Sequence, residues 1–345
     1  MSLIHRVWFD AGVTGKMARG ALWPAEAAYR VVSGARSSLY DRGLRAERLP
    51  PVPALSVGNL SVGGTGKTPI AAWMAARLRS AGASPAIVMR GYGDDEPLVH
   101  ARLNPDIPVH AAPDRLAGTV EAAAAGADCV VLDDAFQHRR VARVVDAVLV
   151  SAEQWSGRVR LLPAGPWREP VGALDRATLV LVTRKSVDRS RATAVAESLS
   201  AHTAAPVAVV FLALGPLMGE EGTMPLESIR GRKLLAIAGI GDPTAFRRQL
   251  EAAGAAVRTA FFGDHHRYSP ADVSVMASTA RADEVVVCTL KDYVKLARHW
   301  PRVSPSLWYV SQRVAPESGE SAITAALDSV LRARHSDLYR PASPV

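Results

Sequence analysis

The residues best suited to chemistry lie in the stretch VGNLSVGGTGKTP, which covers residues 57–69. It nearly matches the phosphate-binding pattern of Gly, four residues and Gly-Lys-Ser/Thr, except that a serine replaces the first glycine. The remaining glycines can take positive φ, so that backbone N–H groups converge on phosphate oxygens. The lysine can then reach the β- and γ-phosphates, and the threonine hydroxyl can bind Mg²⁺. The predicted nucleotide-binding residues are Ser61, Val62, Gly63, Gly64, Thr65, Gly66, Lys67 and Thr68.

The segments on either side of this loop favour a working site. Residues 53–57 form a short apolar run that predicts a buried strand, and residues 70–78 predict a helix. Phosphate would therefore lie at a helix N-terminus, where free N–H groups and the helix dipole favour anions. A glycine-rich turn without a ligand is the alternative, and the strand–loop–helix order disfavours it.

A pair of carboxylates is the second chemical signal. Residues 128–132 are an apolar run that ends at Asp133 and Asp134. A strand that ends in aspartate, downstream of a phosphate loop, is expected to supply the second group that handles Mg²⁺. Two adjacent carboxylates can bind the metal directly or through water. The alternative is a solvated turn at the end of a strand.

The order of the remaining segments predicts an α/β fold. Apolar runs at residues 86–89, 147–150 and 179–182 alternate with loops and helical patterns, which is typical of a mostly parallel sheet flanked by helices, here of the P-loop NTPase type. Such sheets bind ligands in the loops after the strands. A second, smaller α/β unit begins at residue 233. The predicted division is an amphipathic segment at 1–49, a P-loop domain at 50–212, a hinge at 213–232 and a second domain at 233–345.

Composition excludes several classes of protein. A chain of 345 residues with 48% apolar and 21% charged residues can form two ordinary globular domains. Cys129 and Cys288 both lie in apolar runs, which predicts reduced thiols and a cytosolic setting. The sequence shows no apolar run of the length that a membrane span requires and no signal-peptide core, so we expect the chain to stay inside the cell.

The net charge of +8 points to an acidic partner. No aromatic-interleaved basic stripe or nucleic-acid-reading motif is present, so we do not expect nucleic acid. Arginine is instead concentrated before residue 50, around a helical stripe that follows a predicted helix start at Pro24. This segment could rest on an anionic membrane, each basic residue contributing about 1 kcal/mol. It could equally pack on its own domain with a solvated arginine face. The apolar stripe consists of Ala28, Val31, Val32, Ala35 and Leu39.

Two further patterns are weaker. Residues 239–243, GIGDP, lack the third glycine of a dinucleotide fingerprint and have proline at a helix start, which favours an ordinary turn. Asp264, His265 and His266 resemble a metal-ligand group. Adjacent histidines in a strand point to opposite sides, however, so a single metal bound by both is not expected.

Taken together and in order, the motifs resemble the tetraacyldisaccharide 4′-kinases, the lipid A 4′-kinases of Gram-negative envelope synthesis. The match continues beyond the phosphate loop across nearly the whole chain, and the ordered set is specific although each motif alone is weak. The matching stretches are SVGNL at 56–60, RGYG at 90–93, DEP at 95–97, DDAFQHRR at 133–140, LPAGPWREP at 162–170, GIG at 239–241, DHHRY at 264–268 and KDYVKL at 291–296.

The chain also departs from the family pattern. The family places a much longer connection between its Arg-Gly-Tyr-Gly and Asp-Glu-Pro elements, whereas here only Asp94 intervenes. Ala135 replaces a usual glycine, Trp167 a usual aliphatic or small residue, and Leu290 a usual glutamate. None of these changes removes a group to which we assign chemistry.

The resemblance implies transfer of the ATP γ-phosphate to the 4′-hydroxyl of a tetraacyldisaccharide 1-phosphate, with Mg²⁺. It implies a two-domain P-loop architecture that closes over the nucleotide. It also implies that the N-terminal segment rests on the cytoplasmic face of the inner membrane, as a peripheral protein, because the acylated substrate stays in the bilayer. The expected partners are that lipid and the membrane surface, with no obligate protein partner.

The resemblance further implies roles for individual side chains. Asp95 is the expected base and His265 its partner from the second domain, and the shortened connection leaves Asp94 as an alternative base. Lys67 is expected to balance phosphate charge in catalysis, and Thr68, Asp133 and Asp134 to organise the metal. Residues expected to line the site are Gln137, His138, Arg168 and Glu169.

Two other classes remain for comparison. Many P-loop switch proteins that act through protein partners carry a lysine just before the paired glycines, where this chain has Val62. A guanine-reading Asn-Lys-x-Asp motif is also absent from the sequence. A kinase for a small soluble molecule is nearer, but the N-terminal segment counts against it.

Overall fold

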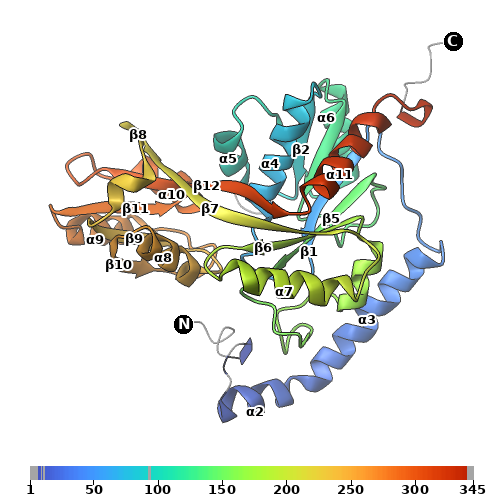
Figure 1. The fold of residues 1–345 in the computed structure, drawn as a ribbon, viewed down its shortest axis with the longest axis horizontal. Helices are drawn as coiled ribbons and strands as arrows, with labels where there is room; N and C mark the ends of the chain where they lie inside the picture. Colours follow the sequence, from blue (N-terminus) through green and yellow to red (C-terminus); the bar gives the residue numbers. More distant parts are fainter. Residues whose placement is uncertain (1–6, 9, 11, 92–94, 340–345) are drawn as a thin grey trace.

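One sheet runs through the whole molecule (Figure 1). The computed structural model describes residues 7, 8, 10, 12–91 and 95–339. Within these residues the sheet has 12 strands, and two groups of strands form its two halves. The strand order is β10-β9-β11-β12-β7-β6-β5-β1-β4-β2-β3, with β8 paired to β7.

The first half of the sheet is parallel and carries the phosphate loop. Successive apolar side chains along its strands point to two different cores. Leu55 and Val131 face one side of the sheet, and Ala54 and Val130 face the other. Helices α4 and α11 cover the first side, and α6 and α7 cover the second. The predicted α/β fold with a mostly parallel sheet is confirmed. The strands are β1 (Ala54–Asn59), β2 (Pro85–Met89), β3 (Val109–Ala111), β4 (Cys129–Asp133), β5 (Val145–Ser151) and β6 (Leu179–Arg184).

The helices of this half connect its strands or lie across them. Helix α4 starts directly after the phosphate loop and runs against β1, β2 and β4. Helix α5 follows β2 and lies beside α4 and, from the other half, α10. Their bounds are α4 (Lys67–Ser80), α5 (Asp95–Leu103), α6 (Arg115–Ala124), η1 (Val171–Arg176), α7 (Arg189–Ser200), α11 (Glu320–Ala333) and η4 (Asp337–Tyr339).

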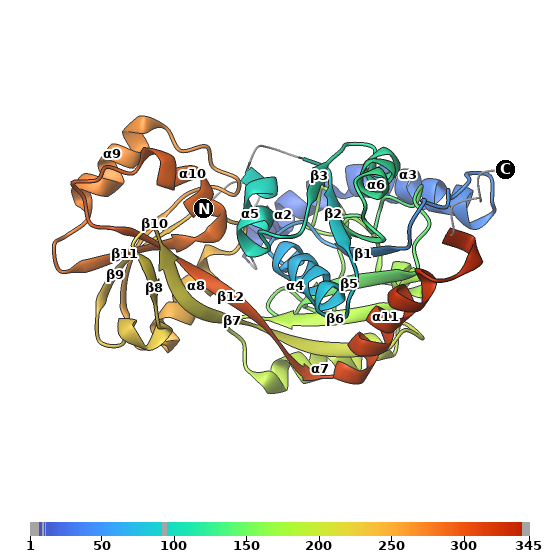
Figure 2. The same ribbon diagram turned by 90° about the horizontal axis from the view of Figure 1, so that it is seen from above.

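A long antiparallel pair joins the two halves. Strands β7 (Val207–Gly219) and β12 (Leu307–Ser318) run from one half into the other, as Figure 2 shows. The segment expected to be a hinge, residues 213–232, is therefore partly strand and not an irregular linker throughout. Residues 213–219 continue β7, β8 (Gly222–Met224) pairs with it, and η2 (Leu226–Ile229) follows. The apolar run of β7 is extensively buried against β12, and this pairing overrides the turn signals of glycine and proline.

The second half is a smaller α/β unit. Its strands β9 (Lys233–Ala238), β10 (Ala256–Phe261) and β11 (Glu284–Thr289) are parallel to one another. Helix α8 (Pro243–Ala252) packs on one face through Phe246 and Leu250. Helices α9 (Pro270–Thr279) and α10 (Leu290–Leu296) pack on the other through Met276 and Leu296, and η3 (Ala297–His299) follows α10.

The C-terminal helix departs from the predicted domain boundary. Residues 233–345 were expected to form the second domain, but α11 packs on the first half. Its residues Ile323, Leu327 and Val330 share a core with Leu55 and Met74. Their spacing places them on one face of a helix, and β12 delivers that face to the first half. The chain thus crosses between the halves twice, outward on β7 and back on β12.

Helices α2 (Val13–Ala21) and α3 (Trp23–Asp41) form an arm along one side of the molecule (Figure 1). Pro24 lies in the first turn of α3, as predicted. The polar face of α3 contacts the first half: Glu26 accepts a hydrogen bond from the N–H of Leu161 at 2.9 Å, and the Tyr29 hydroxyl donates to the Arg168 carbonyl at 3.1 Å.

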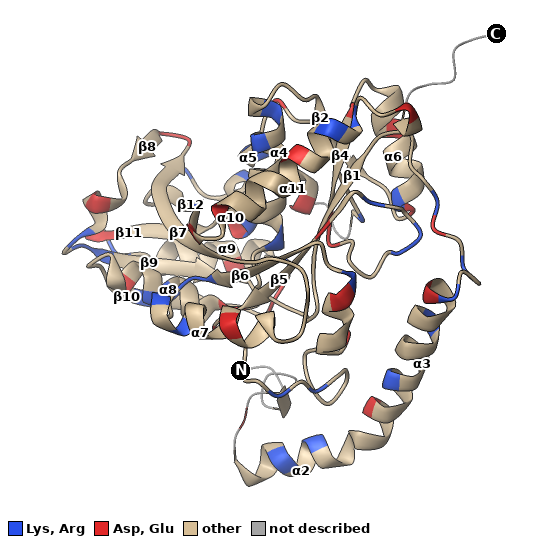
Figure 3. Cartoon of the chain, turned by 45° about the vertical axis from the view of Figure 1, so that its right-hand side comes forward, with Lys and Arg blue, Asp and Glu red and all other residues tan. Residues whose placement is uncertain are grey.

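The opposite face of this arm is apolar and exposed. The packing alternative predicted a solvated arginine face, whereas aliphatic and aromatic side chains of the arm are exposed as well as basic ones. Figure 3 marks the Lys and Arg positions along α2 and α3 in blue. Among the described residues, no helix has the length and apolar content needed to cross a bilayer. The large apolar side chains exposed on the arm are Val13, Met17, Trp23, Val31, Val32 and Leu39.

Candidate nucleotide and phosphoryl-transfer site

The phosphate loop has the backbone conformation that its glycines predict. Gly63 and Gly66 have φ values of 102° and 89°, in the left-handed region that favours glycine. A Cβ on Gly66 would also lie 2.3 Å from Cδ1 of Leu212 on β7. Helix α4 begins at the next residue, Lys67, so its free N–H groups face the loop. Ser61, at the position of the first glycine, is buried and forms a bridge with Trp167.

Side chains from β1 and from β6, two strands away in the sheet, hold this loop. Asn59, at the end of β1, donates from Nδ2 to the Thr65 hydroxyl at 2.9 Å. The Thr183 hydroxyl, on β6, donates to the Thr65 carbonyl at 2.9 Å, and Lys185 donates to the Gly64 carbonyl. Burial lowers the pKa of the Lys185 ammonium, and nearby carboxylates oppose that shift. The loop is therefore fixed in position without a bound phosphate.

Asp134 lies between two cations of the same half. Arg168 donates to both of its oxygens, at 2.9 and 3.3 Å, and Lys67 Nζ lies 3.7 Å from Oδ1. Burial raises the pKa of Asp134, but the two positive charges outweigh it and hold the pKa below its usual value. Burial also lowers the pKa of Lys67, against the opposing charge of Asp134. Asp134 itself has a φ of 52°, which turns its carboxylate toward these partners.

Asp133 has a different partner. Its Oδ2 lies 2.8 Å from Nε2 of His100, a fully buried side chain on α5. Its Oδ1 is buried and has no hydrogen-bond partner among the residues that the structure describes. The two carboxylates predicted to organise a metal are thus adjacent in sequence but held by separate groups.

The residues expected to line the site form a connected layer behind Asp134. Gln137 accepts a hydrogen bond from Arg168 at 3.3 Å and donates to the Asn59 carbonyl at 2.8 Å. Glu169 pairs with Arg176 at 2.7 Å. Burial, aided by two nearby arginines, lowers the pKa of His138 to about 4. Among the four predicted residues, Arg168 also lines the cavity described next.

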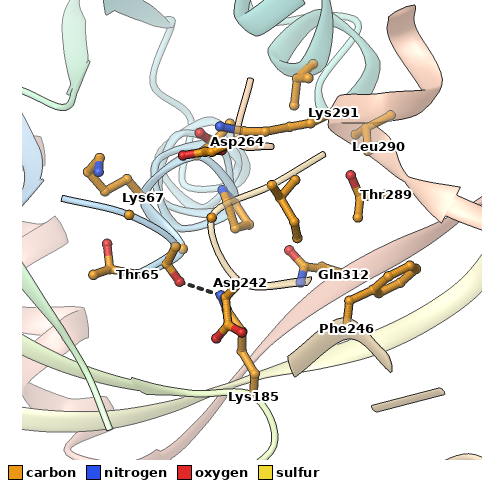
Figure 4. A pocket seen from close by; sticks show the side chains of 18 of the residues that line it. Thr65, Lys67, Lys185, Asp242, Phe246, Asp264, Thr289, Leu290, Lys291 and Gln312 are labelled. Atoms are coloured by element: carbon orange, nitrogen blue, oxygen red, sulfur yellow. Dashed lines mark hydrogen bonds between the residues drawn. The ribbon is translucent and has the colours of Figure 1, made fainter. Parts of the chain in front are cut away.

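A cavity of about 340 Å³ lies between the two halves. Figure 4 shows Thr65 and Lys67 on one side of it and Leu290 on the other. The phosphate loop, Asp133, Asp134 and Arg168 form its polar part. Its more apolar part, between α5, α8 and the β7–β12 pair, includes Val99, Leu103, Leu214, Phe246, Leu290 and Val310.

The GIGDP stretch has a larger role than an ordinary turn. Asp242 does cap α8, accepting from the Ala245 N–H at 3.0 Å, as a turn before a helix would. However, Ile240, Gly241 and Asp242 also line the cavity. A Cβ on Gly241 would lie 3.2 Å from the backbone nitrogen of Gly64, so a side chain here would crowd the phosphate loop.

Sequence reasoning missed several polar side chains of the cavity. Lys185 follows β6, and Lys291 follows β11. The rule that ligands bind beyond the carboxyl ends of strands could have indicated both positions. No signal in the sequence placed Gln312, on β12, at the same cavity. The missed polar lining residues include Lys185, Asp242, Gln249, Thr289, Lys291 and Gln312.

Asp95 and Glu96 begin α5 and are paired with lysines of the second half. Asp95 Oδ2 lies 3.0 Å from Lys295 Nζ, and Glu96 Oε1 lies 3.7 Å from Lys291 Nζ. Both lysines belong to α10, so these ion pairs cross between the halves. Asp94, the alternative base, lies outside the described residues.

His265 lies on a tight turn at the other side of the cavity. It has a φ of 56°, half of its side chain is exposed, and it lines the cavity. His266 points elsewhere, pairing with Asp272 at 3.2 Å and stacking on Phe262. In the part of the chain that the structure describes, the carboxylate of Asp95 pairs with Lys295 and not with His265.

A metal would have few protein ligands here. Among the described residues no group of three His, Cys, Asp or Glu side chains could hold an ion by itself. Mg²⁺ commonly takes one or two protein oxygens and completes its shell with phosphates and water. The unpartnered Oδ1 of Asp133 and the Thr68 hydroxyl, both at the cavity, fit that kind of site.

The parallel sheet, the phosphate loop and the carboxylates after β4 define a P-loop nucleotide-binding protein. The chain belongs to the family described as Tetraacyldisaccharide-1-P 4′-kinase, whose profile matches residues 18–95 and 94–332. The two matches meet at the shortened connection before Asp95.

Named relatives agree with this assignment. The chain is 37% identical to the Tetraacyldisaccharide 4′-kinase of Anaeromyxobacter sp. (strain K), with all of both chains covered. It is 35% identical to the enzyme of that name from Chlorobaculum parvum, over 93% of this chain and 98% of the relative. It also resembles the crystal structure of LpxK from Aquifex aeolicus in complex with ATP, with a TM-score of 0.73 and 28% identity over 90% of this chain and 99% of the other.

Proposed function

We propose that this protein is an ATP-dependent kinase that transfers the γ-phosphate to the 4′-hydroxyl of a tetraacyldisaccharide 1-phosphate in lipid A biosynthesis. The observation that carries the proposal is the arrangement around the phosphate loop. Lys67, Arg168 and the carboxylates after β4 meet there, and a second half lies over them. Its family membership supplies the substrate class.

The cavity has room and chemistry for ATP. The N–H groups of the phosphate loop and of the start of α4 bind the phosphates, with Lys67 near the β- and γ-groups. The adenine ring of ATP then lies in the more apolar part of the cavity, against Leu214, Phe246 and Leu290. Positioning and charge stabilisation of this kind supply most of the catalysis in phosphoryl transfer.

Mg²⁺, when bound, neutralises charge on the phosphates. Thr68 and Asp133 are the residues proposed to hold it, because in the described part of the chain the Asp133 Oδ1 has no hydrogen-bond partner. Asp134 contributes differently. Its carboxylate is already paired with Lys67 and Arg168, so we propose that it positions these two cations and reaches the metal through water.

Asp95 is the proposed base and His265 its proposed partner. In the reaction the 4′-oxygen forms a bond to the γ-phosphorus, the bond from that phosphorus to the leaving ADP oxygen breaks, and the hydroxyl proton passes to the Asp95 carboxylate. Asp95 now pairs with Lys295, so binding of the two substrates must bring His265 and the acceptor hydroxyl to it. Gln137, His138 and Glu169 remain proposed neighbours of the acceptor.

The position and composition of the N-terminal arm support a membrane-binding role. Tyr29 contacts the backbone of Arg168, and Arg36 contacts that of Gln137 at 3.2 Å, so α3 lies next to the catalytic layer. Its exposed apolar side chains can enter the interfacial region of a bilayer, with flanking arginines on anionic lipid. We therefore propose peripheral association with the cytoplasmic face of the inner membrane of a Gram-negative cell.

One assay tests the activity directly. Purified protein, ATP and Mg²⁺ are incubated with the tetraacyldisaccharide 1-phosphate in detergent, and both ADP and phosphorylated lipid are measured. We expect ADP to form with the lipid in equal amounts, with slow hydrolysis when lipid is left out. Strong hydrolysis that a protein partner stimulates and the lipid does not would instead favour a P-loop switch protein.

Vesicle binding tests the arm. Replacing Val31 and Val32 with serine should weaken binding to vesicles that contain phosphatidylglycerol, and added salt should weaken binding of the unchanged protein. Val120→Ser and Val275→Ser together are the matched control, because both valines are exposed on helices of the globular part. Equal binding by all three proteins would contradict the membrane role of the arm.

A further inference from the structure

His100 is a buried polar side chain with no role in the mechanism described above. It lies on α5, and its side chain is 0% exposed. The neighbouring Val99 is also buried. An imidazole at such a position is costly unless it makes a hydrogen bond. The one that it makes is to the carboxylate of Asp133, at 2.8 Å.

The direction of this hydrogen bond follows from the partners. An ionised carboxylate only accepts, so Nε2 of His100 carries the proton and donates to Oδ2 of Asp133. The Asp133 side chain is 6% exposed, and this contact fixes one of its two oxygens. The imidazole thereby fixes the orientation of the Asp133 carboxylate at the end of β4.

The second oxygen of Asp133 is left for a ligand. Oδ1 is buried, has no hydrogen-bond partner among the described residues, and belongs to a residue that lines the cavity together with Lys67 and Thr68. A buried carboxylate oxygen without a partner is costly in the absence of a bound cation or water. Asp133 therefore has one oxygen held by His100 and a second oxygen that no described side chain holds.

Helix α5 is itself fixed at both ends. At its start, Asp95 and Glu96 pair with Lys295 and Lys291 of the second half. Just after its end, Asn104 donates from Nδ2 to the Ala72 carbonyl of α4 at 2.9 Å. His100 lies between these anchors, so its ring is held in place against Asp133.

We propose that His100 is a positioning residue that orients Asp133 toward the Mg²⁺ of the bound nucleotide. The imidazole holds Oδ2, so that Oδ1 faces the metal or a water on it. Side chains that hydrogen-bond to a metal-binding carboxylate in this way typically contribute 10- to 100-fold to metal affinity. This inference rests on the metal role proposed above for Asp133.

Direct metal binding tests it. The full chain is titrated with Mn²⁺ in the presence of a non-hydrolysable ATP analogue, and free Mn²⁺ is measured by electron paramagnetic resonance. We expect His100→Leu to weaken Mn²⁺ binding about tenfold or more, since the leucine keeps the volume and removes the donor. His100→Gln should recover most of the affinity, because its amide Nε2 can reach the same oxygen. In the transfer assay, higher Mg²⁺ should restore much of the rate of His100→Leu.

Asn104→Leu is the matched control. It removes a hydrogen bond that holds α5 but leaves the His100–Asp133 contact in place, so its Mn²⁺ affinity should equal that of the unchanged protein. Unchanged affinity in a folded His100→Leu protein would overturn the proposal. So would equal weakening in Asn104→Leu, since that would show an effect of helix packing.

Asp133→Asn separates this inference from the proposed function. Weak Mn²⁺ binding in Asp133→Asn together with normal binding in His100→Leu would overturn only the positioning role. Normal binding in both would overturn the metal role of Asp133 and, with it, the positioning role. Thermal unfolding of each variant shows whether it is folded before its affinity is compared.

Discussion

Two acidic clusters lie at the same cavity and are balanced in different ways: Asp134 lines the cavity, and Asp95 precedes the lining residue Glu96. Asp134 lies between Lys67 and Arg168, and all three belong to the first half of the molecule. Asp95 also belongs to the first half, but its partner Lys295 comes from α10 of the second half. The first cluster therefore keeps its geometry whatever the position of the second half, whereas the second cluster depends on that position.

This difference separates two requirements of phosphoryl transfer. The charge of the phosphates must be balanced as soon as the nucleotide binds, and a preformed cluster with fixed cations does so without rearrangement. A base must become available only when the acceptor is present. An aspartate paired with a lysine across the two halves can be exposed or masked by their relative movement.

The largest effect is expected at the preformed cluster. Lys67→Ala removes the cation nearest to the transferring phosphate and leaves Asp134 with one partner. We expect phosphoryl transfer to fall on the order of 10³-fold or more, measured as phosphorylated lipid at saturating ATP and Mg²⁺. Arg79→Ala, on the same helix but away from the cavity, should retain full activity. Normal turnover of Lys67→Ala would contradict the phosphate-loop assignment.

The next effect concerns the base. Asp95→Ala and His265→Ala should each lower kcat by roughly 10²–10⁴-fold, the range for one positioned base, while ATP binding remains. The double variant should be little less active than the less active of the two single variants, because the effects of groups that act as a unit are not additive. A fully active Asp95→Ala protein with an inactive Asp94→Ala counterpart would move the base by one residue, and additive losses would separate Asp95 from His265.

A smaller effect is expected at the cation across the two halves. Lys295→Met removes the ion pair of Asp95 and one link between the halves. We expect kcat/KM to fall about tenfold, equivalent to about 1.4 kcal/mol, because the Asp95 carboxylate loses the cation that pairs with it. Lys233→Met is the control, because that lysine pairs with Asp283 at an exposed site of the second half. A loss as large as that of Lys67→Ala would contradict the distinction between the preformed cluster at Asp134 and the Asp95 pair that spans the two halves.

The smallest effect concerns stability and its pH dependence. The pKa of Asp134 is held below its ordinary value of 3.8, so its ionised form stabilises the fold at neutral pH and this contribution is lost as the pH falls through the lowered pKa. Asp134→Asn should lower the free energy of unfolding at pH 7 by about 1 kcal/mol or less, because the carboxyl is partly exposed. Urea unfolding should show that difference shrinking below about pH 4. A difference that grows as the pH falls would contradict the lowered pKa.

The sequence by itself determined the first half of the site. The phosphate loop, its strand and its helix are consecutive, so their geometry follows from local backbone rules at Gly63 and Gly66. The carboxylates Asp133 and Asp134 follow a neighbouring parallel strand, and strand ends of a parallel sheet meet at one edge. These positions, the α/β fold and the family could therefore be predicted without coordinates.

Only the tertiary structure decided how the two halves meet. The return of α11 to the first half depends on β12 pairing with β7 over its whole length, which no local pattern reports. The contact of Gly241 with the phosphate loop and the pairing of Asp95 with Lys295 join residues far apart in the chain. The side of α3 that packs was likewise undecided, because an amphipathic helix can bury either face. The polar face of α3 packs because it forms hydrogen bonds with groups such as the Leu161 N–H, which are in place only once the first half has folded.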